Sequence, residues 1–96
     1  MDWSQKIIKH FESQGIIHYF GCNGGGVLQF LKYLDTYQNN TKTPNFYYMS
    51  EYIAGFMPIG YYLATGNVAC CVCTTGAAQK LAGSGMSDAR FMNIPA

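Results

Sequence analysis

Charge is scarce in this sequence. Only 11% of its 96 residues are charged, six Lys or Arg and five Asp or Glu, whereas an ordinary soluble domain carries roughly 25%. The formal net charge is +1, so the chain has no electrostatic footprint for DNA, RNA or an anionic membrane surface. Because hydrophobic residues make up 49%, we expect another domain or subunit to cover part of the surface.

Long hydrophobic runs are also lacking. No run approaches the ~18–20 apolar residues that span a bilayer, because glycines, Glu51 and Asn67 interrupt the candidates. Residues 1–15 have the pattern of an amphipathic helix rather than of a signal peptide. We therefore expect a cytoplasmic protein. We also expect residues 1–96 to form one domain, because the chain is too short for two.

The four cysteines permit two interpretations. Cys70, Cys71 and Cys73 lie in "NVACCVCTTG", which has the composition of a buried strand, and Cys22 stands apart. Structural zinc usually takes ligand pairs spaced C-x₂₋₄-C in turns, whereas cysteine in a strand behaves as a small hydrophobe. We expect a central buried strand with Cys70 and Cys71 on opposite faces and no metal ligand; metal or redox chemistry is the alternative.

The order of the expected elements alternates between strand and helix. The expected strands are 16–21, 46–50 and, with its turn, 68–76, and the expected helices are 1–15, 27–34, 51–65 and 77–92. Residues 93–96 look like the start of a fourth strand. Strands that are apolar throughout favour an α/β fold, a parallel sheet with helices on both faces.

The first helix is predicted to be amphipathic. Asp2 is a plausible N-cap, and Gly15 is a C-cap signal. The apolar face consists of Trp3, Ile7, Ile8 and Phe11.

Glycine turns follow the first and third strands, at the carboxyl ends where parallel sheets bind ligands. The first, "FGCNGGG", has the spacing G-x-x-G-G-G instead of the dinucleotide pattern G-x-G-x-x-G. A P-loop is excluded because no Gly-Lys-Ser/Thr follows. The second turn, Thr74-Thr75-Gly76, leads into a helix N-terminus, where it serves either as a simple cap or as a contact for a polar ligand.

Glu51 is the only charged residue between Lys42 and Lys80. It is predicted to lie where a strand turns into a helix. One interpretation is a first-turn Glu favoured by the helix dipole, with Ser50 as N-cap, worth ~0.3–1 kcal/mol. The other is a carboxyl held for chemistry, since both glycine turns are expected at the same end of the sheet.

Three motifs together resemble a known family, the N-terminal pyrimidine-binding domain of thiamine-diphosphate-dependent enzymes of the acetolactate synthase and 2-oxoacid decarboxylase type. The motifs are "FGCNGG", "EYIAGFMPIGYYLATG" and "TTGAAQKLAGSGMSDARFMNIP". The second is the most specific, with matches at Glu51, Ala54, Met57, Gly60, Tyr61, Ala64, Thr65 and Gly66. The resemblance covers nearly the whole chain.

The resemblance implies thiamine diphosphate as cofactor and Glu51 as the catalytic residue. In the family this Glu hydrogen-bonds N1′ of the aminopyrimidine and favours the imino tautomer that removes the C2 proton. Such proton sharing needs a carboxyl in a dry pocket. The implied cofactor-binding residues are Glu51, Asn23, Gly24, Gly25, Thr75 and Gly76.

This sequence also departs from the family pattern. Asn23 stands in place of a Pro, Pro58 lies inside the third expected helix and should kink it, and Ala78 and Leu81 replace the Gly and Asn of the second turn.

In the family, Mg²⁺ and the diphosphate are held by a C-terminal domain with a G-D-G…N motif that this sequence lacks. We therefore expect a truncated or split form that works as a homo-oligomer or with a separate C-terminal half. The alternatives are a non-catalytic remnant or interaction module of the same fold and, less favoured, a Rossmann-like nucleotide binder.

Overall fold

The computed structural model describes residues 3–22, 30–32, 34, 45–74 and 76–96. Its elements are α1 (Trp3–Ser13), β1 (His18–Gly21), β2 (Asn45–Tyr48), α3 (Glu51–Thr65), β3 (Cys70–Val72) and α4 (Ala77–Phe91). Residues 30–32 and 34 are helical as well. The predicted alternation of strands and helices is therefore confirmed in the described part of the chain.

The three strands form one parallel sheet in the order β2-β1-β3. The register pairs Gly21 of β1 with Tyr48 on one side and with Val72 on the other. This confirms the α/β fold with a parallel sheet. The predicted central position of the cysteine strand is wrong for the described sheet, because β1 is central and β3 pairs with it from one side. A run that is apolar on both faces does not distinguish a central strand from an edge strand.

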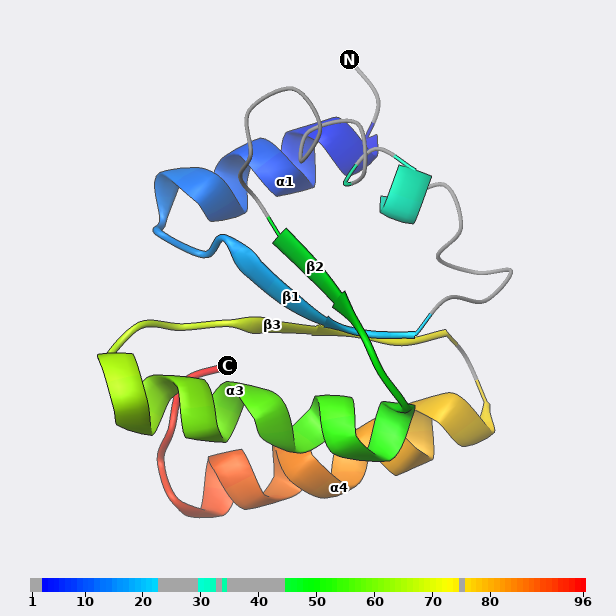
Figure 1. Ribbon diagram of the computed structural model, residues 1–96, viewed down its shortest axis with the longest axis vertical. Helices are drawn as coiled ribbons and strands as arrows, with labels where there is room; N and C mark the ends of the chain where they lie inside the picture. Colours follow the sequence, from blue (N-terminus) through cyan, green and yellow to red (C-terminus); the bar gives the residue numbers. More distant parts are fainter. Residues whose placement is uncertain (1–2, 23–29, 33, 35–44, 75) are drawn as a thin grey trace.

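Helices cover both faces of the sheet (Figure 1). Helix α1 and the helical residues 30–32 and 34 lie on one face, and α3 and α4 lie on the other. Helix α3 contacts β1 and β3 directly, and α4 packs mainly against α3. The order of layers places α3 between the sheet and α4, so its orientation is constrained from two sides.

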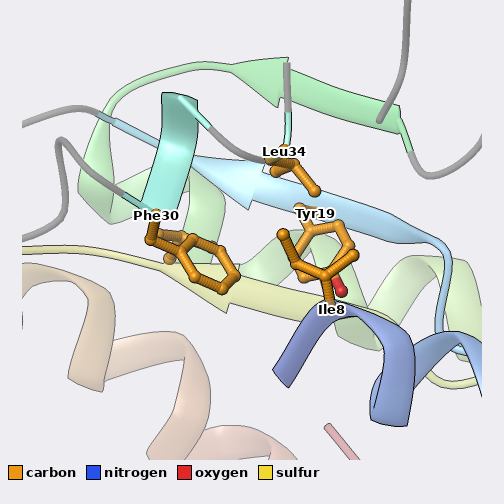
Figure 2. Close-up of a cluster of buried hydrophobic side chains, with 5 residues drawn as sticks. Ile8, Tyr19, Phe30 and Leu34 are labelled. Atoms are coloured by element: carbon orange, nitrogen blue, oxygen red, sulfur yellow. The ribbon is translucent and has the colours of Figure 1, made fainter. Parts of the chain in front are cut away.

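Each face of the sheet has its own hydrophobic cluster. Figure 2 shows the cluster under α1, in which Ile8, Tyr19, Phe30 and Leu34 converge. The cluster under α3 is built from Phe20, Ala54 and Ala69. Tyr19 and Phe20 thus point to opposite faces, as consecutive residues of a strand do.

The cysteines of β3 follow the same alternation. Cys70 packs against the cluster under α1 and Cys71 against the cluster under α3. The prediction that they point to opposite faces is confirmed. Both side chains are only half-buried, which fits the place of β3 at the side of the described sheet.

The buried stripe of α1 differs from the predicted one. Ser4 and Ile8 are fully buried, whereas Trp3 is 52% exposed and Ile7 is exposed as well. Residues four apart lie one above the other on a helix, so the contact with the sheet follows the row through Ser4 and Ile8. The Trp3 ring stacks against Phe30 at the side of this contact, with ring centroids 6.3 Å apart.

The predicted ends of the helices agree with the structure where they are described. Gly15 after α1 and Gly66 after α3 both take positive φ, 82° and 77°, as C-terminal glycines commonly do. The Gly66 N–H donates to the carbonyl of Tyr62 at 2.7 Å. Asp2, the expected N-cap of α1, lies outside the described residues.

The predicted start of a fourth strand is wrong for the described residues. Asn93 adopts the left-handed conformation with φ 59°, and the Ile94 N–H donates to the carbonyl of Ala89 at 2.8 Å. The chain after α4 therefore caps the helix, and residues 94–96 take no part in the described sheet.

Close contact between α3 and α4 depends on two glycines. A Cβ on Gly85 of α4 would overlap the backbone carbonyl of Gly55 in α3, and a Cβ on Gly55 would overlap the carbonyl of Ala82. The two backbones therefore approach more closely than any side chain allows. Glycine lowers intrinsic helix stability, but here its missing side chain permits the packing of α4.

Substitution of Gly85 by Ala should therefore destabilise the fold. The added methyl group forces α3 and α4 apart, and we expect the free energy of unfolding to fall by about 1–3 kcal/mol, the usual cost of overpacking. Gly83→Ala is the matched control, because a Cβ there meets no atom within 4 Å, and Ala should be neutral or stabilising by ~0.5–1 kcal/mol. Urea denaturation of both variants measures the difference; equal stabilities would contradict the close contact.

Candidate functional site

The candidate site lies at the carboxyl edge of the sheet, where the three parallel strands end. Gly21, Tyr48 and Val72 are aligned there by the register. Helices α3 and α4 both begin on this side of the molecule (Figure 1). The residues that follow each strand therefore lie at the same edge of the sheet, as is usual for ligand sites of parallel sheets.

Glu51 is the first residue of α3 and follows β2 after a two-residue connection. Ser50 occupies the N-cap position in extended conformation, with φ −62° and ψ 152°, but its side chain makes no capping hydrogen bond. The predicted position of Glu51 at the junction of strand and helix is confirmed. The carboxyl is half-buried, so the dry pocket that the resemblance implies is not closed by the described residues.

Two protonated side chains lie in electrostatic range of Glu51. Burial, and secondarily the charge of Glu51, raise the pKa of the Cys73 thiol. The pKa of Tyr48 is raised as well, mainly by its interaction with the Cys22 side chain and to a smaller extent by the charge of Glu51. Tyr48 and Cys73 thus stay neutral at physiological pH.

A thiol–phenol hydrogen bond connects the ends of β1 and β2. The Cys22 Sγ–H donates to the Tyr48 hydroxyl oxygen over 3.5 Å. Cys22 itself is tied to β3, because its backbone N–H donates to the carbonyl of Val72 at 3.4 Å. Residues from all three strand ends therefore take part in one connected arrangement beside Glu51.

Gly76 is the second described member of the predicted site. It lies directly before α4 with φ 76° and ψ −132°, a conformation that glycine adopts without strain. Its carbonyl accepts the backbone N–H groups of Gln79 and Lys80 at 3.1 and 3.3 Å. The predicted residues Asn23, Gly24, Gly25 and Thr75 lie outside the described residues.

Sequence reasoning missed Tyr48 and Cys73 as neighbours of Glu51, and Cys22 as the partner of Tyr48. Each lies at or just after the end of a strand, at the edge where the glycine turns were expected. The parallel arrangement is the signal that would have found them, because it brings every strand end to one edge. Their contacts, however, depend on a register that the sequence does not specify.

The two histidines lie away from this edge. His18 opens β1 at its amino end, and its Nδ1 is 3.1 Å from the Tyr47 hydroxyl. The Tyr61 ring packs edge-on against it, with centroids 5.0 Å apart. His10 is exposed on α1. The contacts of His18 are thus with aromatic side chains of β2 and α3.

The cysteines of β3 are poor ligands in this environment. Burial raises the pKa of Cys70 to about 12 and that of Cys71 to about 11, whereas metal ligation requires the thiolate. Among the described residues, no group of three or more His, Cys, Asp or Glu side chains is arranged to hold a metal ion. In the same part of the chain, no helix has the length and apolar character to span a membrane.

Comparison with known proteins agrees with this geometry. Residues 1–96 match the family model described as "Thiamine pyrophosphate enzyme, N-terminal TPP binding domain". The chain belongs to this family, as the motif resemblance predicted. No curated protein and no solved structure matches the chain.

The raised pKa of Cys70 has a consequence for stability at alkaline pH. The thiol stays protonated in the folded state up to about pH 12, whereas it ionises near pH 8.5 once the chain is unfolded. Its contribution to the free energy of unfolding is therefore complete below about pH 8.5 and is lost as the pH rises towards 12. We expect the free energy of unfolding to decline above about pH 8.5. In Cys70→Ala the decline should be shallower, and the remainder comes from the other groups whose pKa values the fold raises, Cys71, Cys73, Tyr19 and Tyr48.

The measurement is urea denaturation at several pH values between neutral and strongly alkaline. The slope against pH is compared, because the substitution also changes the absolute stability. Identical slopes for the parent protein and Cys70→Ala would show that the thiol is not held protonated by the fold.

Proposed function

We propose that the chain binds the aminopyrimidine end of thiamine diphosphate at the carboxyl edge of its sheet. In this proposal it is the N-terminal part of an acetolactate synthase-like or 2-oxoacid decarboxylase-like enzyme, and Glu51 is its catalytic residue. The observation that carries the proposal is the place of Glu51, a half-buried carboxyl at the start of α3, on the edge where β1, β2 and β3 end.

The chemistry of this edge fits a weakly basic heteroaromatic ring. A carboxyl oxygen can share a proton with a ring nitrogen, and Tyr48 and Cys73 beside it are protonated and neutral. The other described carboxyls, Glu12 and Asp88, lie in the second half of α1 and the second half of α4. Glu51 therefore has no described carboxyl at the same helix start to compete with it.

The tasks of the individual residues follow from their positions. Glu51 would hold and exchange a proton at N1′ of the aminopyrimidine. Gly76 would let the backbone before α4 come close to the ligand, and Asn23, Gly24, Gly25 and Thr75 would complete the contacts. When bound, thiamine diphosphate supplies the carbanion-stabilising chemistry of the reaction. As the resemblance implies, we propose that Mg²⁺ and the diphosphate are held by a C-terminal portion or a partner subunit.

Association with another chain or domain is part of the proposal. Large apolar side chains remain open on the described surface, among them Leu63 at 67% and Phe91 at 88% exposure. Contiguous exposed apolar surface commonly marks an interface. A homo-oligomer or a separate C-terminal half would cover such surface and enclose Glu51. A non-catalytic interaction module would use the same surface for association, but its Glu51 would take no part in cofactor chemistry.

The role of Glu51 is tested by exchange of the C2 proton of bound thiamine diphosphate. In the protein's native assembly with Mg²⁺, Glu51→Gln should slow this exchange by about 10²–10⁴-fold, the range typical of general acid–base groups. The amide keeps the size of the side chain and a hydrogen-bonding head, so the folded state should be retained.

The matched control is Glu12→Gln, which makes the same change at a half-buried glutamate on α1. It should leave the exchange rate unchanged. Equal rates in the parent protein and Glu51→Gln, with cofactor still bound, would refute the catalytic role and favour the non-catalytic module.

A further inference from the structure

Tyr48 is an exposed aromatic residue whose orientation is nevertheless fixed. Its side chain is 65% exposed, although an exposed tyrosine normally rotates freely. Here the hydroxyl accepts the hydrogen bond of Cys22 over 3.5 Å. The ring also packs against Phe46 in a T-shaped contact, with centroids 6.4 Å apart and planes at 72°. Two contacts, one at the hydroxyl and one at the ring, thus restrict the orientation of the side chain.

The position of this ring matters as much as its orientation. Tyr48 is the last residue of β2, paired with Gly21 of β1 at the carboxyl edge. Its hydroxyl lies in electrostatic range of the Glu51 carboxyl. An aromatic ring with two contacts of its own therefore stands in electrostatic range of Glu51, the carboxyl that we propose shares a proton with a ring nitrogen.

Tyr52 provides an internal comparison. It is also an exposed tyrosine, at 52%, and follows Glu51 directly in the sequence. Its ring packs against Phe56 one turn further along α3, with centroids 5.4 Å apart. Tyr52 therefore belongs to the surface of the helix, whereas Tyr48 belongs to the ends of the strands.

From these contacts we infer that Tyr48 is a ligand-contact residue of the Glu51 site. Its ring provides a stacking surface for the planar heteroaromatic ring that Glu51 binds, and Cys22 is the positioning residue that holds it. The inference rests on the proposed function, because it takes the aminopyrimidine as the ring. An aromatic side chain that is already oriented before binding contributes affinity for a planar ligand at a low cost in conformational entropy.

The first test is calorimetric titration of the native assembly with thiamine diphosphate and Mg²⁺. Tyr48→Ala should weaken binding about tenfold, the scale of losing one aromatic stacking partner. Tyr48→Phe keeps the ring and should change binding less than about threefold. Tyr52→Ala is the matched control and should bind as the parent does. Since Tyr48 is largely exposed, these substitutions should not disturb folding.

The second test reports on Cys22 and does not depend on activity. A ligand stacked on Tyr48 shields the thiol that holds it, so bound thiamine diphosphate should slow alkylation of Cys22 by iodoacetamide. Trypsin isolates this residue, because Cys22 is the single cysteine between Lys9 and Lys32. The protection should persist in Tyr52→Ala and be lost in Tyr48→Ala.

The outcomes separate this inference from the proposed function. Binding by Tyr48→Ala as tight as in the parent protein, or equal to that of Tyr52→Ala, would overturn the role of Tyr48 alone. Unchanged proton exchange in Glu51→Gln together with weakened binding in Tyr48→Ala would leave the stacking role standing and refute the catalytic one. Absence of thiamine diphosphate binding to the parent assembly would overturn both.

Discussion

The close approach of β3 to β1 at Gly21 determines the geometry of the whole carboxyl edge. A Cβ on Gly21 would overlap the carbonyl of Val72, so the two strands meet at this point only because the residue is glycine. The same carbonyl accepts the N–H of Cys22 at 3.4 Å. On the other side, the Gly21 carbonyl accepts the N–H of Met49 at 2.8 Å. One residue without a side chain thus ties the ends of three strands together.

The orientation of Glu51 depends on how α3 is held. Its inner face rests on the cluster that contains Phe20 and Ala54, and its outer face meets α4 through Gly55. Pro58 lacks an N–H and cannot bond the carbonyl one turn earlier, yet α3 runs without interruption from Glu51 to Thr65. Pro58 is fully buried, and packing on both sides maintains the helix where one of its hydrogen bonds is lost.

Local signals were sufficient to predict most elements, and features that depend on neighbouring elements were not. The bounds of α3 follow from Glu51 after a strand and from Gly66, which takes positive φ at the end of the helix. The place of β3 at the side of the described sheet depends on strand order, which an apolar run on both faces does not encode. The exposure of Trp3 is a similar case, because a broad apolar stripe does not reveal which row of a helix touches the sheet. The place of Tyr48 beside the ends of the other strands could be found only from the register of the sheet.

The small number of charged residues has a physical consequence at the carboxyl edge of the sheet. Tyr48 and Cys73, the two groups whose pKa values the charge of Glu51 helps to raise, are polar but protonated, so neither of them forms an ion pair with the carboxyl. A carboxyl with an ionic partner gives up that interaction when it shares its proton with a neutral ring. Neutral donors and an oriented aromatic ring avoid this cost. In the proposed function, Glu51 would exchange a proton with a weakly basic ligand, and its isolation from other charges in the sequence, from Lys42 to Lys80, agrees with that role.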